Sequence, residues 1–136
     1  MKKTVVTFVR RFTAVLLILA SLTMLGFEYY VGRWNTGVVN YLLLACFALW
    51  GISPYGVFLL LGFVLRDSPA PSLICSIGAI VAVVLGMWVF YDGIFVHLDA
   101  QNALLFLFVP MYQWAWATVI AIISWSLVLA SRIRTP

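Results

Sequence analysis

Charged side chains are scarce in this sequence. Asp, Glu, Lys and Arg make up 9% of the 136 residues, whereas hydrophobic residues make up 65%. Soluble domains are about a quarter charged and about half apolar, so a water-soluble fold would have too few charges to cover its surface. The apolar residues also occur in long runs, which is the pattern that a lipid bilayer requires. The shortage of charge therefore indicates an integral membrane protein.

Motifs for catalysis and cofactor binding are also lacking. The chain has no Walker A loop and no HExxH, GxSxG or GxGxxG pattern, so the sequence predicts neither an enzyme nor a bound cofactor. Its two cysteines, Cys46 and Cys75, form neither a CxxC pair nor a zinc-binding pattern. Their expected depths differ by roughly 13 Å along the helix axes, and a disulfide needs Cα atoms within about 7 Å. We therefore expect no redox pair.

Four apolar runs are long enough to cross a membrane. A helix needs about 20 residues to cross the hydrocarbon core, and the runs predict spans at about 12–31, 38–65, 72–91 and 103–131. The predicted fold is an all-α integral membrane bundle of four transmembrane helices, in one domain over 1–136. The basic and then apolar start also resembles a secretory signal, but a small-residue cleavage site is missing, so we expect an uncleaved first span.

The second and fourth runs are longer than a straight crossing requires, and each contains a proline. Pro54 and Pro110 each remove a backbone N–H donor, so we predict a kink at each. The carbonyl that Pro54 leaves without a donor must be satisfied by a neighbouring group or by Ser53. Two interpretations remain open around Pro110. One is a long kinked helix capped by Asp99, which we prefer, and the other is a separate short helix at 100–109.

Basic residues gather at the ends of the predicted helices. With the N-terminus in the cytoplasm, seven of the eight Lys and Arg residues face inward and Arg33 alone faces outward. Positive side chains favour the cytoplasmic side, so we predict that both termini are cytoplasmic. The same clustering at helix ends argues against nucleic-acid binding. The compact size and short tails favour the inner membrane of a bacterium.

Aromatic and acidic residues gather on the predicted outer face. Clustered aromatic rings anchor interfaces, so we expect this face to bind a partner, although a belt of rings at the lipid–water boundary is the alternative. The residues of this face are Tyr29, Tyr30, Trp34, Asp92, His97 and Asp99. Asp92, His97 and Asp99 are also candidate metal ligands, because imidazole and carboxylate groups bind many metals. In the alternative interpretation Asp92-Gly93 is a turn, His97 a loop residue and Asp99 a helix cap.

Small residues recur at every fourth position of the third run. Gly78, Ala82 and Gly86 form one stripe, along which another helix can approach closely. The spacing suits packing inside the bundle and a homodimer seam equally well, so both interpretations stay open.

Asp, Glu, Lys, Arg and His are missing from most of the predicted spans. None lies within 12–27, 38–65, 72–91 or 103–131, whereas ion- and proton-coupled transporters use such groups inside the membrane. Glu28 comes nearest, about three residues from the outer end of the first span. At that depth its carboxylate can reach the headgroup region, and we expect it to have a structural or interfacial role.

In size and number of spans the chain is similar to small multidrug-resistance transporters and to membrane immunity proteins against pore-forming bacteriocins. The first family requires a carboxylate well inside its first span, and residues 12–27 contain none. We therefore expect a non-enzymatic protein that binds a membrane-protein partner, as an accessory subunit or a toxin-immunity protein does. The alternative is a small homodimeric transporter or channel without an intramembrane charge relay.

Overall fold

The structure is a computed structural model of the chain, and it describes residues 3–32, 38–97 and 104–133. All four long helices in these residues are long and apolar enough to span a membrane, so the predicted all-helical fold with four helices of membrane-spanning length is confirmed. The elements are α1 (Lys3–Gly32), α2 (Val38–Val64), α3 (Pro69–Tyr91), the short π-helix η1 (Asp92–Val96) and α4 (Leu105–Ile133). This arrangement is that of a multi-pass membrane protein.

The chain does not turn after α3, and the turn expected at Asp92-Gly93 is therefore wrong. The backbone continues directly into η1, where the His97 N–H donates to the Asp92 carbonyl at 2.8 Å. Gly93 and Ile94 are buried in the bundle. Burial of Ile94 favours a further helical turn over an exposed loop, because it removes apolar surface from water or the interface.

Two other helix ends differ from the predicted spans. α1 begins at Lys3 rather than near residue 12, since Lys and Arg favour helix nearly as well as Leu and let the helix run past its apolar part. α4 runs without interruption from Leu105 through Pro110, which rules out a separate helix over 105–109. Asp99, the expected cap, lies outside the described residues.

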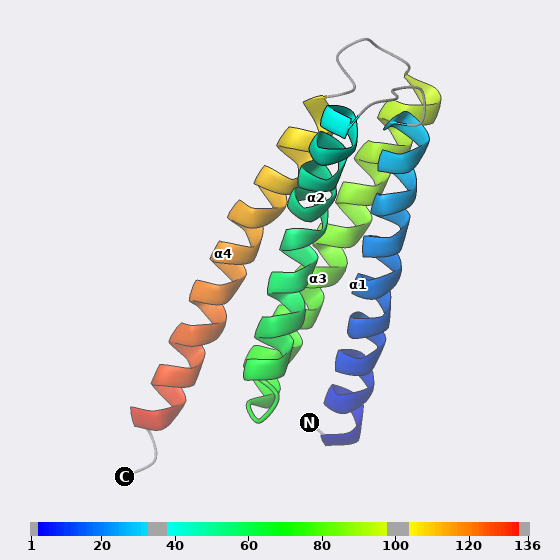
Figure 1. Cartoon of the computed structure of the whole chain (residues 1–136). Helices are drawn as coiled ribbons and strands as arrows, with labels where there is room; N and C mark the ends of the chain where they lie inside the picture. Colours follow the sequence, from blue (N-terminus) through cyan, green and yellow to red (C-terminus); the bar gives the residue numbers. More distant parts are fainter. Residues whose placement is uncertain (1–2, 33–37, 98–103, 134–136) are drawn as a thin grey trace.

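The four helices form a bundle in which α1 and α4 occupy opposite corners. Each of them packs against both α2 and α3, which lie between them (Figure 1). The start of α1, the α2–α3 turn and the end of α4 lie at one end of the molecule, which we call the basic end because Arg10, Arg11 and Arg66 belong to it. The opposite end, with η1, we call the aromatic end. Core residues come from every long helix and include Leu17, Met24, Tyr55, Phe58, Phe90 and Ala117.

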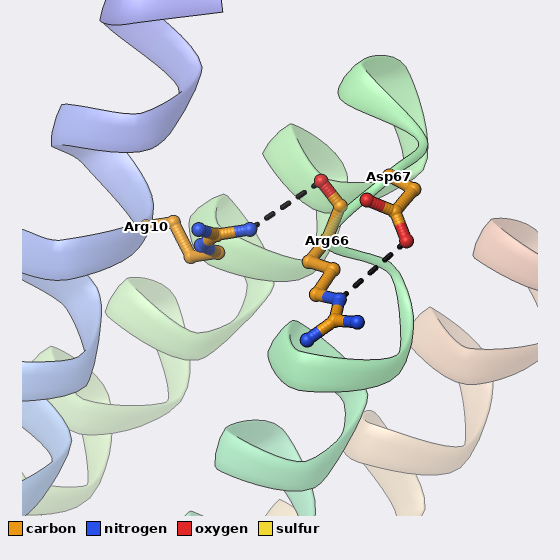
Figure 2. Close-up of polar contacts among 3 residues, drawn as sticks. All are labelled: Arg10, Arg66 and Asp67. Carbon is orange, nitrogen blue, oxygen red and sulfur yellow. Dashed lines mark hydrogen bonds and ion pairs between the residues drawn. The ribbon is translucent and has the colours of Figure 1, made fainter.

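Arg10 ties α1 to the α2–α3 turn at the basic end. Its Nη1 donates to the Arg66 carbonyl at 3.3 Å (Figure 2). The Arg66 guanidinium lies 4.9 Å from the centroid of the Phe63 ring and its Nε lies 3.5 Å from Asp67 Oδ2. The side chains of Arg66 and Asp67 are 53% and 89% exposed, so this ion pair contributes little stability.

Aromatic rings in tilted and edge-to-face contacts hold the aromatic end together. The rings of Phe27 and Phe95 lie 5.9 Å apart between centroids, and those of Phe90 and Phe106 lie 5.2 Å apart. Further pairs in contact are Phe27 with Phe90, Tyr30 with Phe95, and Tyr91 with Phe95. Pairs of this kind stabilise by about 0.5–1.5 kcal/mol beyond their area burial. The cluster joins α1, α3, η1 and α4, and it fixes the last turns of α1, where Glu28 lies.

Candidate functional site

Glu28 is buried inside the bundle, and its expected structural or interfacial role stays a prediction. The residue is 4% exposed. Both carboxyl oxygens are covered, and neither receives a hydrogen bond from a described residue. The cause is helical periodicity, because Glu28 continues the buried stripe of α1. That stripe comprises Thr13, Leu17, Ala20, Met24 and Glu28.

The carboxyl group of Glu28 lies deeper than its position near the end of α1 suggests. A Cβ atom placed on Gly51 would stand 2.9 Å from Glu28 Oε1 and 2.7 Å from Met24 Cε. Gly51 is the central residue of α2. Side chains of a helix lean toward its N-terminus, and this lean carries the carboxyl group down to the middle of α2. The missing side chain of Gly51 leaves the space that the group occupies.

A pocket opens beside Glu28 on the flank of the bundle formed by α1 and α2. Its cavity measures about 210 Å³. The lining residues are Leu25, Glu28 and Tyr29 of α1 and Tyr41, Leu44, Ala45 and Ala48 of α2. Tyr29 and Tyr41 are 70% and 63% exposed, so they stand at its rim. The pocket is apolar except for the two phenol groups and the side chain of Glu28, whose carboxyl oxygens are covered.

The structure divides the six residues of the predicted outer face. Tyr29 lines the Glu28 pocket, whereas the Tyr30 ring contacts the Phe95 ring in a tilted arrangement with centroids 5.8 Å apart. Asp92 Oδ2 and His97 Nδ1 lie 3.0 Å apart, at the beginning and after the end of η1. Trp34 and Asp99 lie outside the described residues. Tyr29 alone of the described members belongs to the pocket.

The candidate metal ligands do not form a described site. Among residues 3–32, 38–97 and 104–133, no three His, Cys, Asp or Glu side chains gather closely enough to hold a metal ion. Asp92 and His97 pair with each other, and Asp99 lies outside these ranges. Both cysteines are free thiols: Cys46 is exposed, and Cys75 is buried with its Sγ 3.9 Å from the Phe58 carbonyl.

The small-residue stripe of α3 faces α4 within the same chain. A Cβ atom on Gly78 would stand 2.7 Å from Ile120, and one on Gly86 would overlap the side-chain amide of Gln113. Ala82 contributes its carbonyl, which accepts a hydrogen bond from Gln113 Nε2 at 3.0 Å. α4 therefore occupies the space along this stripe.

A buried polar layer crosses the bundle at Gln113. Gln113 is 5% exposed, and its Nε2 also donates to the Tyr55 hydroxyl at 3.0 Å. Trp116 Nε1 donates to the Gly78 carbonyl at 2.9 Å. These bonds join α4 to α2 and to α3. Sequence reasoning missed Gln113, although it stands on one stripe with Val109, Ala117 and Ile120.

The carbonyl exposed by Pro54 is satisfied as predicted. Ser53 Oγ donates to the Trp50 carbonyl at 2.7 Å and accepts from Trp114 Nε1 at 2.8 Å. Trp50 Nε1 donates in turn to the Leu107 carbonyl at 3.2 Å. A polar seam therefore joins α2 to α4, and it lies on a different face of α2 from the Glu28 pocket.

Together these features define a class: a four-helix membrane bundle with a carboxyl group buried beside a lateral pocket. No protein-family model, no curated protein and no solved structure matches the chain. The functional argument therefore rests on the chemistry of the site itself.

Proposed function

We propose that this chain works by binding another membrane protein, and that it does so through the Glu28 pocket. The observation that carries the proposal is the pair of covered Glu28 oxygens without a hydrogen bond from a described residue, beside an open pocket. A bare carboxylate in such surroundings costs several kcal/mol. The group therefore needs either a proton or a positively charged neighbour. A protein that fills the pocket supplies the second.

This proposal moves the binding surface from the end of the bundle to its side. The outer-face hypothesis placed the partner on Tyr29, Tyr30, Trp34, Asp92, His97 and Asp99. Of these, Asp92 and His97 already pair with each other, and Tyr29 lines the pocket. The pocket, in contrast, opens between two membrane-spanning helices. A lateral contact of this kind suits both an accessory subunit and an immunity protein that act on another membrane protein.

The proposed membrane topology has both termini in the cytoplasm of a bacterial cell, within one domain. The support is the grouping of Arg10, Arg11 and Arg66 at the basic end, because positive side chains favour the cytoplasmic side. The pocket then lies in the outer half of the bilayer. Kinks at Pro54 and Pro110 are part of the same proposal, since each proline removes one bond of its helix.

A second candidate function is transport of a cation. The sequence argued against transport because no Asp, Glu, Lys, Arg or His lies well inside the predicted spans. The carboxyl group of Glu28, which reaches the middle of α2, can supply such a group. Transport predicts flux of an organic cation into proteoliposomes that contain the chain, and loss of this flux in Glu28→Gln. A partner-binding protein predicts no flux in either case.

Photo-crosslinking in native membranes tests the partner proposal. A benzoyl-phenylalanine is placed at Ala45, which lines the pocket, and in a matched variant at Leu129, which is exposed on α4 at the opposite corner. We expect the Ala45 variant to form one discrete adduct with a second membrane protein, in a ratio that intact-mass analysis shows to be fixed. An adduct from Leu129 alone, or from neither position, would contradict the proposal.

A further inference from the structure

The Glu28 pocket carries an inference about what the partner presents, and this inference rests on the proposed function. We propose that the pocket receives a lysine or arginine side chain from a transmembrane helix of a different protein. That side chain would stand in the outer half of the bilayer. It would pair with the Glu28 carboxylate once the Glu28 side chain turns from its covered position beside Gly51 into the pocket.

Charge complementarity is the first argument. Glu28 is the single charged residue among the seven that line the pocket, and its oxygens have no hydrogen bond from a described residue. Ammonium and guanidinium groups form the strongest hydrogen bonds with carboxylates. A basic residue within a spanning helix is itself unstable in lipid and needs an acidic neighbour. Each group therefore removes the desolvation cost of the other.

The size and shape of the pocket favour a side chain on a helix over a free ligand. Sites for drug-sized molecules measure about 300–1,000 Å³, and this cavity of about 210 Å³ is smaller. It is also open along the flank of the bundle, where Ala45 and Ala48 lie one turn apart on α2. Small residues on the surface of a helix let the backbone of a neighbouring helix come close. A docked helix would cover the opening and a long side chain would fill the cavity.

A second copy of this chain offers no described basic residue at the right depth. Arg10 and Arg11 belong to the basic end, and Arg10 lies about 27 Å from Glu28 along α1 at 1.5 Å per residue. Arg66 lies in the turn at the same end. Arg33, outside the described residues, follows α1 and is the one residue of a second copy that the experiment must exclude.

Designed transmembrane peptides test this inference with the full chain. A leucine–alanine peptide of about 22 residues carries lysine at a position in its outer half, and its matched control carries norleucine there. Binding to the full chain is measured by energy transfer in phosphatidylcholine vesicles. We expect the lysine peptide to bind at least about tenfold more tightly than the norleucine peptide. Glu28→Gln should abolish this preference without changing the helical circular dichroism.

A second variant tests whether the peptides bind at the pocket while leaving the Glu28 carboxyl group unchanged. Ala48→Leu fills the pocket and should abolish binding of both peptides, whereas Ala115→Leu, at an exposed alanine of α4, should leave binding unchanged. Equal binding of the lysine and norleucine peptides would overturn the inference. A dimer of the chain that forms without peptide and is lost in Arg33→Gln would also overturn it. The same holds if tetraethylammonium displaces both peptides and the lysine peptide binds no more tightly than the norleucine peptide.

Failure here can be told apart from failure of the proposed function. A fixed-ratio adduct at Ala45 together with equal binding of both peptides would retain a membrane-protein partner at the pocket and reject the basic side chain. Absence of the adduct together with equal peptide binding would reject both.

Discussion

Gly86 shows how much depends on a single absent methyl group. A Cβ atom there would overlap Gln113 Nε2, so Gly86→Ala should force the amide away from the Tyr55 hydroxyl and the Ala82 carbonyl. Hydrogen bonds between membrane helices contribute about 0.6 kcal/mol on average and up to about 1.7 kcal/mol. We expect the free energy of unfolding to fall by about 1–3 kcal/mol, measured by steric trapping in bicelles.

Gly62 provides the matched control for that measurement. It also lies within a helix, but a Cβ atom there meets nothing within 4 Å. Gly62→Ala should be neutral or slightly stabilising, because alanine favours helix over glycine by up to about 1 kcal/mol. Equal losses for Gly86→Ala and Gly62→Ala would show that Gln113 does not hold α4 in place.

The burial of Glu28 and Gln113 can be predicted from the sequence, but the groups that their side chains contact cannot. Glu28 falls four residues after Met24 and Gln113 falls four residues before Ala117, so periodicity alone places both on buried stripes. The expected position of Glu28 followed from counting residues along the chain. Such counting omits the lean of the side chain and the space at Gly51, which belongs to a different helix.

The α2–α4 seam supports a prediction at the scale of the element. Ser53→Ala removes the hydroxyl that donates to the Trp50 carbonyl. No backbone donor takes its place, because Pro54 has no N–H. We expect a loss of about 1–2 kcal/mol in the free energy of unfolding. In a Pro54→Ala background the new N–H reaches the Trp50 carbonyl, so Ser53→Ala should cost less. Double-mutant analysis by steric trapping measures this difference.

Ser126→Ala is the control for the seam. Ser126 Oγ donates to the Ile122 carbonyl at 2.8 Å, and in a regular helix that carbonyl also accepts the Ser126 N–H. Its loss should therefore change stability by less than about 0.5 kcal/mol. If the costs of Ser53→Ala with and without Pro54 were equal, the hydroxyl would not be a substitute for the missing donor.

Elements were predictable where one physical requirement dominates. Lipid demands about 20 apolar residues per helix, and each of the four apolar runs forms a helix. Helix ends were less predictable, because the burial of Ile94 overrides the turn tendency of Asp92-Gly93. The stripe at Gly78 stayed ambiguous because its spacing specifies a close neighbour and not which helix that neighbour is.

At the scale of the whole molecule, the arrangement of helices was beyond sequence reasoning. The four runs have similar length and composition, so nothing in them specifies that α1 and α4 take opposite corners. This choice leaves α1 and α2 adjacent and creates the pocket between them. The candidate site therefore depends on which helices pack side by side, and the individual residues only line it.

The orientation of the bundle decides which leaflet the Glu28 pocket faces, and two exposed positions test it. Asp67 at the basic end and His97 at the aromatic end have side chains 89% and 75% exposed. In a background of Cys46→Ser and Cys75→Ala, a membrane-impermeant maleimide added to intact cells should label His97→Cys and not Asp67→Cys. Asp67→Cys should react once the cells are opened. Positive side chains on the cytoplasmic side require this pattern. The reverse pattern would place the basic end outside and the pocket in the inner half of the bilayer, where a partner's basic residue would have to lie instead.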